Sequence, residues 1–249
     1  MTTREATSLL PRSIDTAMID DCARSLSDRA AVMAFGAIQW PWLLRSLRGG
    51  RLADKHALLD RLELPHDALP YLGSWKADTG LLKLLVDHIE AHRPRLVVEF
   101  GTGASTLVLA RALQRFGGGT LISFDQHGDF VEATSQWLAD HGLEADLRAA
   151  PLRSSPDGWP GLWYDHGPLP KGIELMLIDG PPWVVHPLTR GAAASLFDQV
   201  AVGGTVMLDD AARPGERLVA RRWRKLRPDF AFELDRSGTK GTLIGRRLR

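Results

Sequence analysis

The pattern of apolar positions becomes regular from about residue 79 and predicts an alternation of helices and buried strands. Apolar side chains fall on one face of an amphipathic helix that ends before Pro94, namely Leu81, Leu82, Leu85 and Ile89. Residues 95–100 (RLVVEF) follow as a buried strand. Further strands are expected at residues 120–124, 146–150, 174–178 and 205–208. Because strands and helices alternate, the sheet should be mostly parallel and doubly wound.

The helices between these strands are predicted from periodicity and from end signals. One should begin at Asp129, with Glu132 three residues on as in a capping box. Another should follow the glycine turn after the first strand, a third should cover about residues 192–200, and a basic one about residues 215–226. A Pro-, Gly- and Trp-rich loop through residue 171 reads as an insertion on the substrate side.

Both ends of the chain differ from this alternating pattern. Residues 1–75 carry short helical segments broken by proline and glycine, and predict an N-terminal helical extension that covers the α/β domain of residues 76–249. At the other end, FAFELD (230–235) and GTLIGR (241–246) flank a turn and predict a closing antiparallel hairpin.

Composition narrows the class without naming a substrate. The chain has 249 residues, 44% hydrophobic content and a formal net charge of +1, which is ordinary for one globular α/β domain with an extension. Cys22 is the single cysteine, so an internal disulfide is excluded and a cytoplasmic location is expected. No signal peptide is expected. The most apolar stretch, residues 30–44, is interrupted by Gln39 and Pro41 and is too short to span a bilayer; packing on the domain is favoured over a membrane-interface role for Trp40.

The strand, turn and helix of VVEFGTGAST (97–106) indicate a ligand site. Its glycines let the backbone approach a ligand at a helix N-terminus. Thr106 stands where a dinucleotide fingerprint has its third glycine, and Glu99 would repel a pyrophosphate but attract an ammonium group. Asp125 ends the second strand, where a carboxylate can accept hydrogen bonds from ribose hydroxyls. The pattern favours a nucleoside that carries an amino acid over a nicotinamide dinucleotide.

Four segments together resemble motifs of the class I S-adenosylmethionine-dependent methyltransferases, of the catechol-O-methyltransferase-like and related small-molecule type. They are EFGTGAST, FDQ, LIDGPPW (177–183) and GGTVMLDDAARPGE (203–216). The resemblance implies a seven-stranded Rossmann-like sheet and methylation of a hydroxyl on a small-molecule or saccharide-type acceptor. It also implies that Gly101, Thr102, Gly103 and Ser105 hold the methionine moiety, that Glu99 orients it, and that Asp125 binds the ribose.

Candidate catalytic residues follow the two central strands. Asp179 and Asp210 end these strands beside the expected methyl position, and in the catechol-type enzymes their equivalents bind a divalent cation together with an asparagine. Ala211 occupies the asparagine's place, so a divalent cation is possible but not favoured, and a carboxylate can instead accept a proton. His186, just after LIDGPPW, and His166, in the long loop, are candidate bases.

Other functions stay open at this stage. Pro181-Pro182-Trp183 resembles the proline-proline-aromatic motif of amino-group methyltransferases, and the basic helix could contact RNA phosphates. The helix is interpreted instead as a solvated face, with Leu218, Trp223 and the stem of Arg222 packed on the sheet, so nucleic acid is an unlikely partner. A non-catalytic S-adenosylmethionine-binding interaction module is the remaining alternative. The chain is expected to be a monomer or a homodimer.

Overall fold

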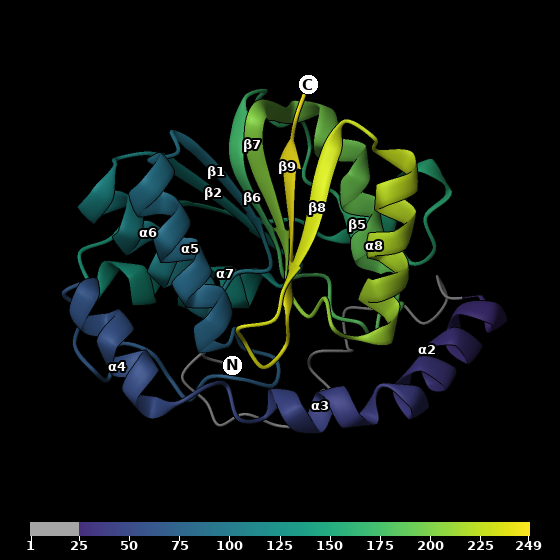
Figure 1. The fold of residues 1–249 in the computed structure, drawn as a ribbon, viewed down its shortest axis with the longest axis horizontal. Coiled ribbons are helices and arrows are strands. Elements are labelled where there is room, and N and C mark those ends of the chain that lie inside the picture. Colours follow the sequence, from purple (N-terminus) through teal and green to yellow (C-terminus); the bar gives the residue numbers. More distant parts are fainter. Residues whose placement is uncertain (1–24) are drawn as a thin grey trace.

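A computed structural model describes residues 25–249, and its centre is a seven-stranded sheet (Figure 1). The strand order is β3-β2-β1-β6-β7-β9-β8. The strands are β1 (Leu96–Phe100), β2 (Thr120–Asp125), β3 (Asp146–Ala149), β6 (Ile173–Ile178), β7 (Val200–Leu208), β8 (Phe230–Asp235) and β9 (Thr242–Arg247). Five neighbouring strands of the sheet, β3, β2, β1, β6 and β7, are parallel, whereas β9 lies antiparallel between β7 and β8. The mostly parallel sheet and the closing hairpin expected from the sequence are confirmed.

Helices cover both faces of the sheet (Figure 1). One hydrophobic core joins α4, α5 and α6 to the side chains of Val97 and Leu175, and the other joins α8 and η3 to Val98 and Phe100. Neighbouring residues of a strand thus enter opposite cores, as the twofold period of a strand requires. The helices are α2 (Leu26–Ile38), α3 (Trp40–Ser46), α4 (Leu52–Arg61), α5 (Thr79–His92), α6 (Ala104–Phe116), α7 (Gly128–Ala139), η3 (Thr189–Gln199) and α8 (Pro214–Leu226).

The connection from β3 to β6 departs from regular winding. It holds a two-stranded antiparallel hairpin of β4 (Leu152–Ser154) and β5 (Leu162–Tyr164), with a short 3-10 turn η2 (Pro156–Gly158) between them. Trp163 and Tyr164 of β5 are buried against Phe100. An aromatic wall therefore packs on β1, in the connection that the sequence indicated as an insertion.

Two local expectations were wrong. The helix after β2 begins at Gly128, with His127 as its N-cap and no side-chain cap, so Asp129 does not open it. The segment expected as a helix at 192–200 is a run of 3-10 turns from residue 189 to 199, and residue 200 already belongs to β7.

The N-terminal helices α2, α3 and α4 follow one another along one end of the molecule (Figure 1). The apolar stretch of residues 30–44 forms two helices that meet at Gln39. Leu58 and Leu59 of α4 are buried in the core with α5, whereas no residue of α2 is fully buried. Among the described residues no helix is long and apolar enough to cross a membrane. Cys22 lies outside the described residues.

Candidate functional site

The turn between β1 and α6 needs glycine at two positions. Gly101 has a φ of +104°, and a Cβ there would lie 2.9 Å from the backbone nitrogen of Gly180. Gly103 has a φ of +154° and is the N-cap of α6. Positive φ at both positions, and at Gly101 the close approach of the residues after β6, therefore favour glycine.

Glu99 lies beneath the turn and is fully buried. Its Oε2 accepts hydrogen bonds from the Thr106 hydroxyl at 2.6 Å and the Ser123 hydroxyl at 2.5 Å. The Thr106 oxygen in turn accepts the backbone N–H of Gly103 at 2.8 Å. Burial raises the pKa of Glu99 to about 7, although these hydroxyls oppose the rise. The Thr106 hydroxyl therefore links the glycine turn to Glu99 by two hydrogen bonds. From the sequence, Thr106 was noted only as a departure from the dinucleotide-binding fingerprint.

Asp125 ends β2 next to the same turn. Its carboxylate accepts the backbone N–H of His127 at 2.9 Å and that of Thr102 at 3.3 Å. Burial raises the pKa of Asp125 to about 7. Each carboxylate oxygen has a second lone pair, so these bonds leave acceptor capacity for a ligand hydroxyl.

Two further polar atoms at this turn are buried without a hydrogen-bond partner among the described residues. They are the Oε1 atom of Glu99 and the hydroxyl of Thr102. Ser105, also predicted for the cofactor, is buried at the start of α6 and lies near enough to Glu99 to lower its pKa. Buried polar groups nearly always have partners, so the orphaned atoms fit a polar ligand at the turn. That these residues bind S-adenosylmethionine stays a prediction.

Three carboxylates meet where β6 and β7 end. Carboxylate oxygens of Asp179, Asp209 and Asp210 all lie within 4.8 Å of one another. Asp209 and Asp210 are buried, whereas Asp179 keeps 12% of its side chain exposed. The structure thus brings together the two predicted residues and adds Asp209.

Three buried cations already surround these carboxylates. The Arg190 guanidinium donates to Asp210 at 3.0 Å and lies 3.5 Å from an Asp179 oxygen. Lys240 Nζ lies 3.0 Å from Asp209, and Arg213 lies 2.8 Å from Asp210. Burial opposes ionisation of Asp210, but Arg213, Lys240 and Arg190 together hold the pKa of its carboxyl well below the usual range.

Mg²⁺ is coordinated by oxygen ligands such as carboxylates, so the three aspartates are of the right chemical type to bind it. The positions beside the oxygens, however, are taken by cationic side chains whose charge compensates the carboxylates. Arg190 and Lys240 were missed by sequence reasoning because they come from η3 and from the loop before β9, without a motif to mark them.

Neither candidate histidine forms a hydrogen bond or an ion pair with this cluster among the described residues. His186 accepts the backbone N–H of Leu188 at its Nδ1 and faces Asp28 of α2 at 3.9 Å, and burial lowers its pKa. None of its contacts among the described residues reaches Asp179 or Asp210. His166 packs edge-on against Phe100, and burial also lowers its pKa. A catalytic role for His186 therefore stays a prediction that its contacts do not favour.

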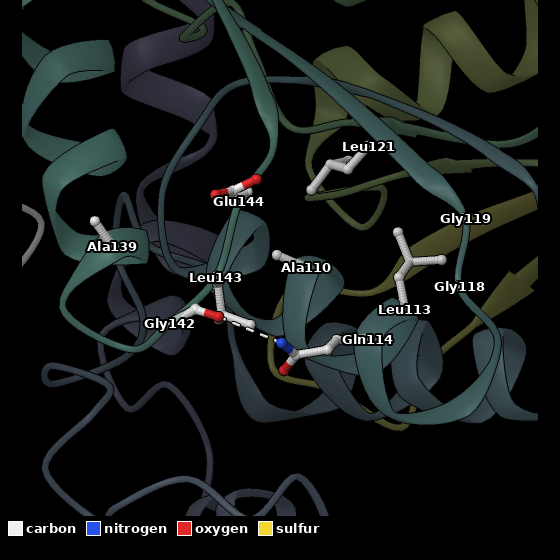
Figure 2. Close-up of a pocket in the computed structure, with 10 residues that line it drawn as sticks. All are labelled: Ala110, Leu113, Gln114, Gly118, Gly119, Leu121, Ala139, Gly142, Leu143 and Glu144. Carbon is white, nitrogen blue, oxygen red and sulfur yellow. Dashed lines mark hydrogen bonds between the residues drawn. The ribbon is translucent and has the colours of Figure 1, made fainter.

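A separate pocket of about 480 Å³ lies at the opposite edge of the sheet (Figure 2). Residues from the end of α6, the start of β2 and the end of α7 line it, among them Leu113, Leu121 and Leu143. Gln114 donates to the carbonyl of Gly142 across it at 3.3 Å. Because Asp125 stands at the other end of β2, this pocket is not part of the candidate site.

Comparisons with known proteins agree with the fold. Residues 98–211 match a family described as a methyltransferase domain. No curated protein matches the sequence significantly.

Solved methyltransferases share the architecture. The O-methyltransferase TomG from Streptomyces achromogenes, involved in tomaymycin synthesis and solved with S-adenosylmethionine, superposes with a TM-score of 0.53 at 16% identity, over 80% of this chain and 89% of that one. A Bacillus cereus O-methyltransferase solved with S-adenosylhomocysteine has a TM-score of 0.53 at 13% identity. The match covers 87% of this chain and 99% of that one. A methyltransferase from Geobacter sulfurreducens has a TM-score of 0.52 at 18% identity. The match covers 79% of this chain and 88% of that one. The fold is that of these solved methyltransferases, and the family match covers residues 98–211 of the chain.

Proposed function

We propose that the protein is an S-adenosylmethionine-dependent methyltransferase that methylates a hydroxyl group of a small molecule. The observation that carries the proposal is the glycine turn with buried Glu99 beneath it and Asp125 beside it, in a methyltransferase fold. A nearly neutral chain and a helix-covered sheet suit a small acceptor. The O-methyltransferase neighbours support oxygen as the acceptor atom.

The proposed roles of the residues rest on the resemblance to class I methyltransferases and are supported by their positions around the turn. Bound S-adenosylmethionine would supply an electrophilic methyl group, and S-adenosylhomocysteine would remain after transfer. The turn from Gly101 to Gly103 would hold the methionine moiety, and Asp125 would accept hydrogen bonds from the ribose. The enzyme mainly aligns the reacting groups and takes the proton that the acceptor hydroxyl loses.

Asp179 is the best-placed proton acceptor. It is the one carboxylate of the three with a partly exposed side chain, and burial raises its pKa, which makes it a better base near neutral pH. Asp210 forms ion pairs with Arg190 and Arg213 and would hold these two side chains in position. Because Arg190, Arg213 and Lys240 already compensate the carboxylates, we expect turnover without a divalent metal. The single cysteine keeps the cytoplasm as the proposed location.

Calorimetry tests the cofactor part of the proposal. S-adenosylmethionine and S-adenosylhomocysteine should bind and raise the melting temperature, whereas NADH should not. Asp125→Ala should weaken binding of both by about 1–3 kcal/mol. Asp129→Ala, which removes an exposed carboxylate nearby, is the matched control and should bind as the wild type does. Binding of NADH alone would reject the proposal.

Turnover separates an enzyme from a binding module. Radiolabelled cofactor incubated with a set of hydroxylated small molecules, with amines and with RNA should label a hydroxyl compound. Labelled amine or RNA would assign a different acceptor class, and binding without any turnover would favour the interaction module.

A further inference from the structure

Tyr164 places a hydroxyl at the centre of the candidate site. It is the last residue of β5 and is 4% exposed, and its ring lies 5.6 Å from that of Phe100. A Cβ built on Gly180 would lie 2.0 Å from the hydroxyl and 3.2 Å from the Cα of Gly101. The hydroxyl thus lies beside the residue that follows Asp179 and close to the first glycine of the turn.

This hydroxyl has no hydrogen-bond partner among the described residues. A buried tyrosine hydroxyl usually finds a partner, because leaving it unpaired costs free energy. Nothing in the core requires the oxygen, since a phenylalanine would fill the same space. The partner is therefore expected to come from a bound molecule.

The charges around the hydroxyl indicate the kind of group that binds there. Burial is the main cause that raises the pKa of Tyr164 well above its usual value, so the phenol stays neutral. The charges of Asp125, Asp179 and Glu99 also oppose its ionisation, whereas that of Arg190 favours it. A neutral oxygen among three carboxylates favours a cationic neighbour.

We propose that the Tyr164 hydroxyl is a cofactor-binding group that contacts the sulfonium end of S-adenosylmethionine and aligns its methyl group toward Asp179. The inference rests on the proposed function. A methyl group on a sulfonium carries polarised C–H bonds, which a lone pair of the phenol oxygen can accept. Since the hydroxyl lies between the cofactor turn and the Asp179 end of β6, it meets the cofactor at the reacting side.

Tyr164→Phe tests this by removing only the oxygen. The variant should fold with an unchanged or higher melting temperature, because an unsatisfied buried group is lost. Its affinity for S-adenosylmethionine should fall about tenfold, whereas that for the uncharged S-adenosylhomocysteine should change much less. Tyr71→Phe is the matched control, because Tyr71 is the other tyrosine of the chain and is 77% exposed.

A spectroscopic readout makes the result independent of turnover. In the Tyr71→Phe variant Tyr164 is the only tyrosine, so one ¹³C-labelled ring reports on it. Its Cζ resonance should move more with S-adenosylmethionine than with S-adenosylhomocysteine. Equal losses for both ligands, or an unmoved resonance while the wild type binds the cofactor, would overturn the inference. A wild type that binds neither ligand would instead refute the proposed function.

Discussion

The ammonium group of Lys240 lies 3.0 Å from a carboxylate oxygen of Asp209, and both side chains are sealed from solvent. The same ammonium lies 3.5 Å from Asp210. A lysine from the loop before β9 thereby reaches the end of β7. Burial alone would keep such groups uncharged, so the pair is stable only while both partners are present.

Lys240→Met should therefore destabilise the protein by about 3–5 kcal/mol, because it leaves buried carboxylates without their cation. The double variant Lys240→Met/Asp209→Asn should lose less than the sum of the two single variants, since the residues are coupled. Chemical denaturation of the four proteins measures this. Strict additivity would mean that the contact carries no coupling energy.

Divalent metals should have little effect on the wild-type protein. EDTA should leave wild-type binding and turnover unchanged, and Mg²⁺ should not raise the melting temperature, because Lys240, Arg190 and Arg213 already balance the carboxylates. In Lys240→Met, by contrast, Mg²⁺ should recover part of the lost stability by binding the freed oxygens. Loss of wild-type turnover with EDTA, restored by Mg²⁺, would contradict this.

The sheet and the glycine turn could be predicted from the sequence because each depends on local pattern. Apolar runs predict the strands, and Gly101 and Gly103 occupy positions where the backbone has a positive φ. Tyr164, Arg190 and Lys240 could not be predicted, because they come from three separate connections and carry no shared motif. The three residues lie near one edge of the sheet only because of how the chain folds in three dimensions.

The basic helix gives a third prediction. The Arg222 guanidinium lies 4.0 Å from the centre of the Trp159 ring, and Trp223 is fully buried, as expected. Leu218, expected to pack, is 42% exposed, so that part of the interpretation was wrong. Arg222→Ala should cost about 0.5–1 kcal/mol through the lost cation–π contact.

Arg221→Ala removes another exposed charge from the same helix and is the control, with little expected change. Neither variant should alter nucleic-acid binding in gel-shift titrations across salt concentrations. RNA binding by the wild type with a steep salt dependence would revive the nucleic-acid alternative.

The fourth prediction follows from the buried acid beneath the turn. The pKa of Glu99 is raised from 4.5 to about 7, mainly by burial. Between these values the folded protein binds more protons than the unfolded chain, so the contribution of Glu99 to stability is present at low pH and is lost as pH rises toward 7. Glu99→Gln should therefore flatten the fall of melting temperature between about pH 5 and pH 8.

Cofactor binding should show the opposite dependence. A cationic ligand binds better when Glu99 is ionised, so the rise in melting temperature caused by S-adenosylmethionine should grow as pH passes through 7. Glu132→Gln, which changes an exposed carboxylate, should retain both trends of the wild type. If Glu99→Gln and the wild type showed parallel profiles with and without cofactor, Glu99 would be ionised throughout and its burial would have no effect on binding.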